Sequence, residues 1–334
     1  MAGPRVTVSL VTYNGVRWLD GCLASLRAQT LDDYELIVRD NASTDGTVEL
    51  LRSRLADDTR ARIVESPRNL GYAAAHNLAV HAARSEFVLL LNQDVELDGG
   101  FLAAALETLD ERPAVAAIQG RIRRLEPGGT RADVLDTTGL EMRRDRRFVS
   151  RSQGRLDGTV HDQAGSVFGA DGPAPVYRTA ALRDARLPRT GGGWEVLDED
   201  FFMYKEDVDL AWRLRRLGWD AWYEPRAVAW HGRGAAGPPG DGLLAIARSN
   251  RLIPRWIKQV SWRNQRLMQL KNESLSDYLR DLPWIARREV LSLGFILVAD
   301  PRRLSVVPGL IRLLPSAARK RRYLWRRIRA RRAT

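Results

Sequence analysis

The residues best suited to chemistry follow three short runs of β-forming residues. Residues 12–15 (TYNG) follow the first run, 40–46 (DNASTDG) the second and 92–94 (NQD) the fourth. In an open parallel sheet the ligand crevice lies outside the carboxyl ends of the strands, so these acidic and amide side chains would meet there and bind a polar ligand. Helix capping explains any single loop equally well. Three such loops at one edge favour a binding site.

A further group of acidic side chains lies later in the chain. Residues 198–219 (DEDFFMYKEDVDLAWRLRRLGW) place carboxylates before a segment whose Leu210, Leu214 and Leu217 share one helical face. The helix dipole favours acidic side chains at a helix N-terminus. The pattern therefore predicts a helix that begins among carboxylates, either as a solvated first turn or as part of a site.

The elements that must position these groups are strands alternating with helices. Five β-rich runs, at 6–13, 35–40, 61–65, 87–92 and 114–119, are separated by stretches with helical spacing, such as Leu19, Leu23 and Leu26. This alternation is typical of an α/β fold with a parallel sheet and right-handed crossovers. Residues 121–162 are rich in Arg and Gly and predict irregular hairpins and loops.

Composition limits the class of protein. The chain has 334 residues, 44% of them hydrophobic, which is enough to bury a sizeable core. The net charge is +12, and nine basic residues with no acidic one fall between Arg319 and Arg332, so the excess charge lies mainly in this tail. A single cysteine, Cys22, excludes an intrachain disulfide and suits a reducing compartment.

The chain offers no obvious membrane-spanning or signal segment. Its longest mostly apolar run, 290–299, has ten residues, about half of what a spanning helix requires. The first residues lack the apolar run of a signal peptide, so we expect a cytoplasmic protein. Residues 232–242 (GRGAAGPPGDG) predict a flexible connection. The sequence from residue 243 onward has helical spacing, is rich in Arg and has tryptophans among the basic residues, a pattern that suits a membrane surface or an oligomer contact.

Taken together, these motifs resemble the family 2 inverting nucleotide-sugar glycosyltransferases, which have the GT-A fold, and within them the rhamnosyltransferase-like bacterial branch. The matching stretches are VSLVTYNG (8–15), VRDNASTDGT (38–47), RNLGYAAAHN (68–77), LLLNQDVEL (89–97), FFMYKEDVDLAWRLRRLGW (201–219) and His231. The resemblance implies a Rossmann-like mixed sheet with a parallel N-terminal half. It also implies a GT-A domain over 1–235, with a nucleotide-binding half (1–120) and an acceptor-binding half (121–235), followed by a helical basic segment over 243–334.

The resemblance implies a divalent cation, Mg²⁺ or Mn²⁺, as cofactor. Asp94 matches the last carboxylate of the family's metal-binding motif, and Asn92 stands where an Asp-x-Asp pattern has its first carboxylate. His231 matches a late histidine that is a metal ligand in some members. Such a cation, held by hard oxygen ligands, neutralises the departing diphosphate. Asn92 could coordinate through its amide oxygen, and weaker metal dependence is the alternative.

The resemblance also assigns catalytic and nucleotide-binding residues. Asp207 is expected to be the general base that deprotonates the acceptor hydroxyl, with Glu206 second and Asp209 third. Asp40 matches a carboxylate that hydrogen-bonds the pyrimidine base, whose ring N–H suits an acceptor. The other residues expected to bind the nucleotide are Thr12, Tyr13, Asn14, Asn41, Asp45, Arg68, Asn69 and Asn77.

The expected reaction is sugar transfer, with dTDP-rhamnose as first candidate donor, to a glycan or polyprenyl-linked acceptor in bacterial cell-surface polysaccharide synthesis. The enzyme would associate with the inner face of the plasma membrane through its basic tail, and it could form a homodimer. UDP-galactofuranose and UDP-hexoses are alternative donors. A basic nucleic-acid-binding protein and an inactive scaffold, which Asn92 favours, are the other hypotheses. The chain has no G-x-G-x-x-G after the first strand, no P-loop and no zinc-type Cys/His cluster.

Overall fold

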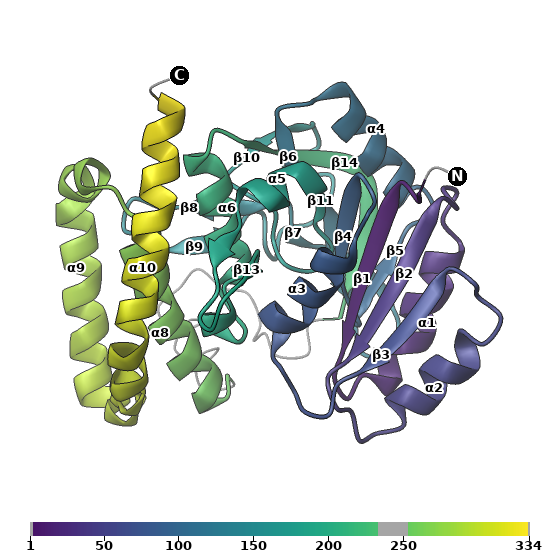
Figure 1. The fold of residues 1–334 in the computed structure, drawn as a ribbon, viewed down its shortest axis with the longest axis horizontal. Coiled ribbons are helices and arrows are strands. Elements are labelled where there is room, and N and C mark those ends of the chain that lie inside the picture. The colour runs from purple at the N-terminus through teal and green to yellow at the C-terminus, as the bar shows by residue number, and fades with distance from the viewer. Residues whose placement is uncertain (1–2, 233–252, 333–334) are drawn as a thin grey trace.

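A ten-stranded mixed sheet organises the computed structural model, which describes residues 3–232 and 253–332 (Figure 1). The strand order is β10-β14-β6-β11-β4-β1-β2-β3, with β5 paired to β14 and β7 to β6. The strands are β1 (Val6–Thr12), β2 (Tyr34–Asp40), β3 (Ala61–Glu65), β4 (Phe87–Asn92), β5 (Val95–Leu97), β6 (Val115–Leu125), β7 (Arg131–Thr137), β10 (Gly165–Val167), β11 (Val176–Arg178) and β14 (Asp220–His231). Two small sheets pair β8 (Leu140–Met142) with β9 (Phe148–Ser150) and β12 (Leu187–Pro188) with β13 (Trp194–Glu195).

The N-terminal half of the sheet is parallel, as predicted. Strands β3, β2, β1 and β4 are consecutive parallel neighbours, and Val6 lies opposite both Tyr34 and Phe87. The parallel order ends at β11, which runs antiparallel between β4 and β6. The predicted α/β GT-A fold class, with its mixed sheet, is therefore confirmed. The region expected to be irregular contains the hairpins of β6 to β9.

Helices cover both faces of the sheet because its strands are apolar on both sides. Phe87, Leu89 and Leu91 of β4 pack with the helices of one face, whereas Val88 and Leu90 pack on the other, as the two-residue period of a strand requires. The first face contacts α1 (Val16–Arg27), α2 (Thr47–Arg54) and α4 (Phe101–Glu111). The second contacts α3 (Tyr72–Ala82), α5 (Thr179–Asp184) and α6 (Glu206–Arg216).

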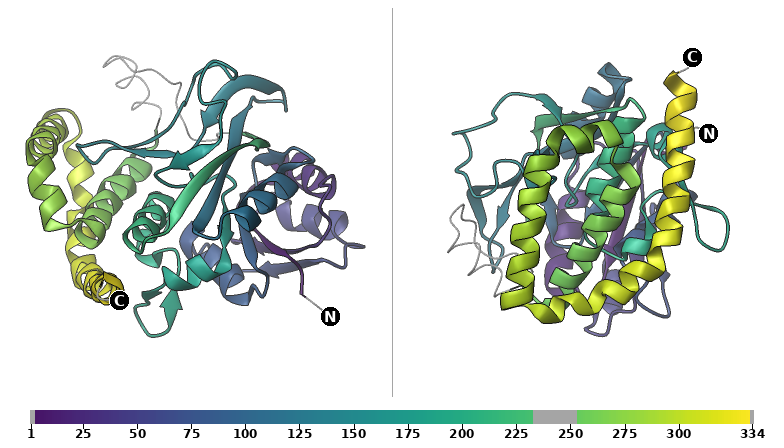
Figure 2. Two further views of the ribbon diagram at one scale, coloured as in Figure 1. Left: turned by 90° about the horizontal axis from the view of Figure 1, so that it is seen from above. Right: turned by 90° about the vertical axis from the view of Figure 1, so that its left-hand side faces the viewer.

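The C-terminal helices pack onto the rest of the protein instead of standing apart (Figure 2). They are α8 (Arg255–Asn272), α9 (Leu275–Ala299), the short 3-10 helix η2 (Pro301–Val306) and α10 (Val307–Arg332). Leu324 and Ile328 of α10 belong to the same apolar cluster as α6, and Leu267 and Met268 of α8 pack with Trp212. The predicted boundary near residue 243 lies outside the described residues, as does most of the predicted connection, and stays a prediction.

Much of the basic tail is used within the fold. Lys320 is fully buried, Arg321 donates to main-chain carbonyls at the end of α8, and Arg327 pairs with Asp184. These three side chains have partners within the fold, so the tail offers less free charge than its composition indicates, and its association with a membrane stays a prediction. Across the described part of the chain, every helix is too short or too polar to span a bilayer.

Candidate active site

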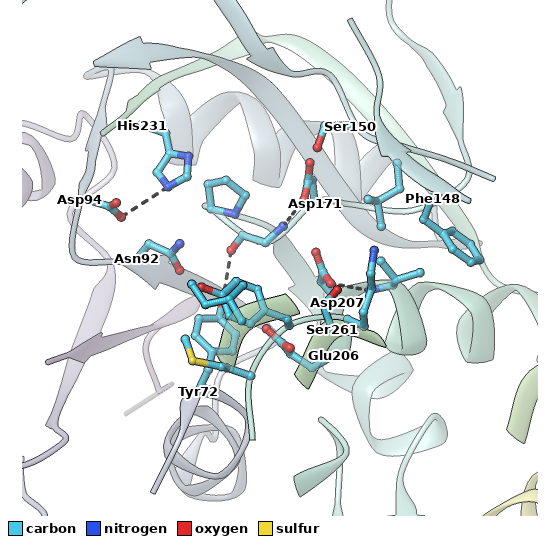
Figure 3. Close-up of a pocket in the computed structure, with 18 of the residues that line it drawn as sticks. Tyr72, Asn92, Asp94, Phe148, Ser150, Asp171, Glu206, Asp207, His231 and Ser261 are labelled. Carbon is cyan, nitrogen blue, oxygen red and sulfur yellow. Dashed lines mark hydrogen bonds and ion pairs between the residues drawn. The ribbon is translucent and has the colours of Figure 1, made fainter. Parts of the chain in front are cut away.

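A cavity of about 630 Å³ lies at the carboxyl end of β4 and is lined from both halves of the chain (Figure 3). Five of the six residues predicted to bind the metal or to act as base line it: Asn92, Asp94, Glu206, Asp207 and His231. In Figure 3, Asn92, Asp94 and His231 lie on one side, while Asp171, Glu206 and Asp207 lie on the other. The structure thus brings together residues that are up to 139 positions apart in the sequence.

Strand pairing brings Asp94 and His231 together. Strand β5 begins directly after Asp94 and pairs antiparallel with the end of β14, so that Val95 lies opposite His231. His231 Nε2 lies 3.4 Å from Asp94 Oδ1, and its Nδ1 lies 2.9 Å from Asp136 Oδ2. Burial alone lowers the pKa of His231, but the carboxylates of Asp94 and Asp136 outweigh it and raise the pKa to about 10.

This side of the cavity has the donors that a divalent cation requires. The side-chain oxygen of Asn92 is buried and has no hydrogen-bond partner in the described structure. Asp94, two residues later, contributes a carboxylate to the same cavity. Carboxylate and amide oxygens suit Mg²⁺ and Mn²⁺. Asp136 orients the imidazole of His231 from behind, as outer carboxylates do for metal-bound histidines. In the described residues, no three His, Cys, Asp or Glu side chains form a metal cluster, so the fit depends on the amide of Asn92.

The opposite side holds the candidate base. Glu206 and Asp207 are the first two residues of α6, and Asp207 Oδ1 accepts a hydrogen bond from the amide of Val208 at 2.7 Å. Burial and the neighbouring Asp171 raise the pKa of Asp207 to about 7, against the opposing effect of Lys205. Burial and Asp207 likewise raise the pKa of Glu206. A carboxylate with a pKa near neutrality is suited to accept and hold a proton at physiological pH.

The loop that presents these carboxylates is strained. Phe202, Tyr204 and Lys205 have φ values of 65°, 68° and 76°, which non-glycine residues rarely adopt. Each such residue costs on the order of 1–3 kcal/mol and persists only where its surroundings hold it. Asn264 of α8, which is fully buried, supplies this support. Its Nδ2 donates to the carbonyl oxygens of Phe201, Met203 and Tyr204 at 3.0, 2.9 and 2.8 Å.

The third candidate base, Asp209, has a different place. It belongs to α6 but is fully buried, and it pairs with Arg213 and Lys271, each at 2.9 Å. Lys271 of α8 and Lys320 of α10 both also pair with Asp198. Asp209 is therefore part of a buried ion network that holds the C-terminal helices against α6. It does not line the cavity, so the sequence-based option of Asp209 as base is not supported.

The residues predicted to bind the nucleotide base gather beside the cavity. Asp40 is only 1% exposed and accepts hydrogen bonds from Thr12 Oγ1 and the amide of Ser43, both at 2.9 Å. The main chain of Tyr13 exchanges two hydrogen bonds with the side chain of Gln93, at 2.9 and 3.1 Å, and Gln93 lines the cavity. The loops after β1 and β4 are thereby joined.

The loop after β2 follows the same edge. Asn14 Oδ1 accepts from the amide of Thr44, and Asp45 accepts from the amides of Val16 and Thr47, which fixes the loop after β2 against the start of α1. These bonds satisfy main-chain groups at the start of the helices, in agreement with the capping alternative.

The motif at 68–77 is divided between two places. Asn41 and Asn69 bond the main chain around Gly71, and Arg68 is exposed. Asn77 is buried, and its side chain bonds the main chain of Val196 and Leu197. The structure therefore does not bring Asn77 to the nucleotide loops, because its amide holds α3 against the segment before α6.

Sequence reasoning missed several residues around the cavity. Asp171 follows β10 in the turn ADGP, an acidic turn signal that was available. Tyr72 also lines the cavity, and its hydroxyl donates to the carbonyl of Gly172 at 3.2 Å. No local pattern distinguishes Asp136 or Asn264, because their roles arise from long-range contacts.

Comparison with known proteins agrees with this geometry. Residues 7–171 match the model of the family described as "Glycosyl transferase family 2", so the chain contains a family 2 glycosyltransferase domain. It is 27% identical over 248 residues to N-acetylglucosaminyl-diphospho-decaprenol L-rhamnosyltransferase of Mycobacterium tuberculosis, covering 67% of this chain and 75% of that protein. Among the first curated relatives, the share of the relative's own length that is covered ranges from 15% to 75%.

Solved structures show the same fold at low sequence identity. The structure of TarS residues 1–349 from S. aureus has a TM-score of 0.54 and 18% identity, covering 94% of this chain and 82% of that one. A mannosyltransferase, PcManGT from Pyrobaculum calidifontis, in complex with GDP-Man and Mn²⁺, has a TM-score of 0.51 and 18% identity, covering 95% and 76%. These similarities establish the GT-A architecture.

Proposed function

We propose that the protein transfers a sugar from a nucleotide-diphospho-sugar to an acceptor hydroxyl, with inversion at the anomeric carbon and with the 630 Å³ cavity as active site. The observation that carries the proposal is the arrangement of two groups across one cavity. Asn92, Asp94 and His231 offer cation ligands, and Asp207 offers a carboxylate whose burial favours proton uptake.

The residues of this chain have separate tasks in the reaction. The acceptor oxygen attacks the anomeric carbon while the bond from that carbon to the diphosphate oxygen breaks. Asp207 takes the acceptor's proton as this happens, and Glu206 is the second candidate. A divalent cation held by Asp94, Asn92 and His231 would offset the charge that develops on the departing nucleoside diphosphate.

The donor proposed first is dTDP-rhamnose. The mycobacterial relative is named as an L-rhamnosyltransferase. Asp40 already accepts hydrogen bonds from Thr12 Oγ1 and from the amide and hydroxyl of Ser43, so of its roughly four acceptor positions one is left for the ring N–H of thymine or uracil. Uracil offers the same N–H, so UDP-galactofuranose and UDP-hexoses are the alternative donors.

The acceptor proposed is a glycan or a polyprenyl-linked saccharide of cell-surface polysaccharide synthesis, reached from the inner face of the plasma membrane. Helix α9 supports membrane association because it exposes several large apolar side chains, including Leu279, Val290 and Val298. The same surface would serve a homodimer. The nucleic-acid hypothesis is less favoured because Lys320, Arg321 and Arg327 are held within the fold.

Replacement of the base tests the proposal. Asp207→Asn should reduce transfer by at least 10³-fold while nucleotide-sugar binding, measured by calorimetry, stays within about threefold. Asp110→Asn, at a carboxylate that pairs with Arg5 and does not line this cavity, is the control and should keep full activity. Undiminished turnover by Asp207→Asn would refute the assignment, and nucleotide binding without turnover by the unmodified protein would favour the scaffold hypothesis.

A further inference from the structure

A second cavity, of about 320 Å³, adjoins the candidate active site and is strongly basic. The two cavities share Lys205, Phe148, Ile257 and Ser261 in their linings, so they are continuous. Among the described residues, the second cavity is lined by no Asp or Glu and by six cationic side chains: Arg147, Lys205, Lys258, Arg266, Arg288 and Arg303. It therefore concentrates positive charge beside the candidate base.

Nearby carboxylates compensate this charge only in part. Arg147 and Arg303 pair with Asp145 and Asp300 at 2.7 and 3.0 Å. Arg266 and Arg288, by contrast, share a single carboxylate, that of Glu289, at 2.6 and 3.3 Å. The ammonium group of Lys205 forms no hydrogen bond or ion pair with the described residues, although Asp207 and Asp171 lie near enough to act on its charge. The buried indole N–H of Trp262, which also lines the cavity, has no hydrogen-bond partner there. Burial, together with the neighbouring Arg288 and Arg303, lowers the pKa of Arg266 to about 10 against the effect of Glu289. An anion in this cavity would supply the missing counter-charge and acceptors.

The basic cavity is distinct from the site expected to hold the donor's diphosphate. Asn92, Asp94 and His231 line the first cavity and are absent from the lining of the second, as are the loops after β1 and β2. Its walls come instead from β9, α8, α9 and η2. A substrate whose sugar hydroxyl lies at Asp207 could therefore extend an anionic group toward these helices.

We propose that this basic cavity binds the diphosphate group of a lipid-linked acceptor, an inference that rests on the proposed glycosyltransferase function. Arginine clusters with convergent N–H donors suit phosphate oxygens. A lipid-borne source is favoured over a free phosphate because α9, which contributes Arg288, also exposes Val290, Leu291 and Leu297 to solvent. The anion would be bound at the cavity while the apolar chain follows the exposed side of α9.

The test is calorimetric titration of the full-length protein with farnesyl diphosphate, in the presence of saturating UDP or dTDP and Mn²⁺. Ser292→Asp places a negative charge in the cavity wall, and Ser292→Asn is its neutral control of the same size. A unit charge this close to a diphosphate should weaken binding by on the order of tenfold or more. Ser292→Asn should bind within about twofold of the unmodified protein, and farnesol, which lacks the anion, should bind far more weakly.

The outcomes separate this proposal from the proposed function. Competition between farnesyl diphosphate and the nucleotide, or equal binding by both Ser292 variants, would overturn the basic cavity as a separate site, although nucleotide-sugar binding would remain intact. Failure of the nucleotide to bind would instead count against the proposed function. Phosphatidylglycerol vesicles form a further arm: if Ser292→Asp weakens vesicle binding but leaves farnesyl diphosphate binding unchanged, the cavity recognises a phospholipid headgroup and the acceptor assignment is wrong.

Discussion

Asn264 is expected to control activity from outside the cavity. Its amide nitrogen donates to three carbonyl oxygens of the loop that precedes Glu206 and Asp207, and three residues of that loop have positive φ. Asn264→Ala removes this donor from the carbonyls of Met203 and Tyr204, whereas the carbonyl of Phe201 keeps the guanidinium of Arg263 and the amide of Met203 as donors. An unsatisfied buried carbonyl costs about 1–3 kcal/mol. Without this support the loop can relax, which releases strain of on the order of 1–3 kcal/mol in each left-handed residue. We expect a loss of about 2–4 kcal/mol in unfolding free energy.

The neighbouring Gln265 supplies a matched control. It is also buried on α8, and its amide donates to one main-chain carbonyl, that of Arg146, at 3.0 Å, away from the loop. Gln265→Ala should lower the unfolding free energy by about 1–3 kcal/mol. Because Gln265 also lines the basic cavity, the comparison is made at saturating donor and acceptor, where its transfer rate should stay within about twofold. Asn264→Ala should lower the transfer rate at saturating substrates at least tenfold, with nucleotide binding nearly unchanged. Denaturant unfolding and initial rates measure both quantities. Equal transfer rates in the two variants would refute the support assigned to Asn264.

Four other predictions concern charge. The transfer rate should rise with pH up to about 7 and then level off, because Asp207, facing Asp171, Lys205 and Glu206, must lose its proton before it can act as base. Because the pKa of Asp207 is raised in the folded state, the contribution of Asp207 to stability falls as pH rises through about 4 to 7. Asp207→Asn should therefore stabilise the protein more at pH 8 than at pH 4. A difference in unfolding free energy that does not change with pH would contradict this. Asn92→Asp should tighten Mn²⁺ binding and Asp94→Ala should abolish it, as measured by calorimetry in the presence of nucleotide. Unchanged Mn²⁺ binding by Asp94→Ala would show that Asp94 is not a ligand. Lys320→Met should lower the unfolding free energy by about 3–5 kcal/mol, because Glu195, Asp198 and Asp200 lose a buried partner at 2.5, 2.5 and 2.7 Å. Arg52→Ala, at the exposed pair with Glu65, should lower it by less than about 1 kcal/mol. Similar losses in the two variants would show that the buried network is not a major source of stability.

The fold was predictable where apolar periodicity is local. The runs 61–65 and 87–92 coincide with β3 and β4, and Leu210, Leu214 and Leu217 pack on one face as their spacing indicates. Polar residues that end parallel strands meet at one edge for purely geometric reasons, so the contact between the loops after β1 and β4 was predictable from strand ends. The place of Asp207 across the cavity from Asn92 and Asp94 was expected only from the family resemblance.

The rest depends on contacts between distant segments. Asp136 reaches His231 across 95 residues, and Asn264 reaches Tyr204 across 60, without any pattern in the intervening sequence. The tail illustrates a second limit: a count of basic residues does not reveal which of them are paired. Lys320 lies on the buried side of α10, so a residue that the composition assigns to a cationic surface is part of the core.

The most direct test of the central claim is thermal unfolding of the protein with a panel of dTDP- and UDP-sugars, in Mn²⁺ or in EDTA. A donor at 100 times its Kd should stabilise the protein by about 2.7 kcal/mol. We predict stabilisation by one nucleotide family in Mn²⁺, its reduction in EDTA and its loss in Asp94→Ala. Absence of stabilisation by every donor would contradict the assignment of the cavity as a nucleotide-sugar site.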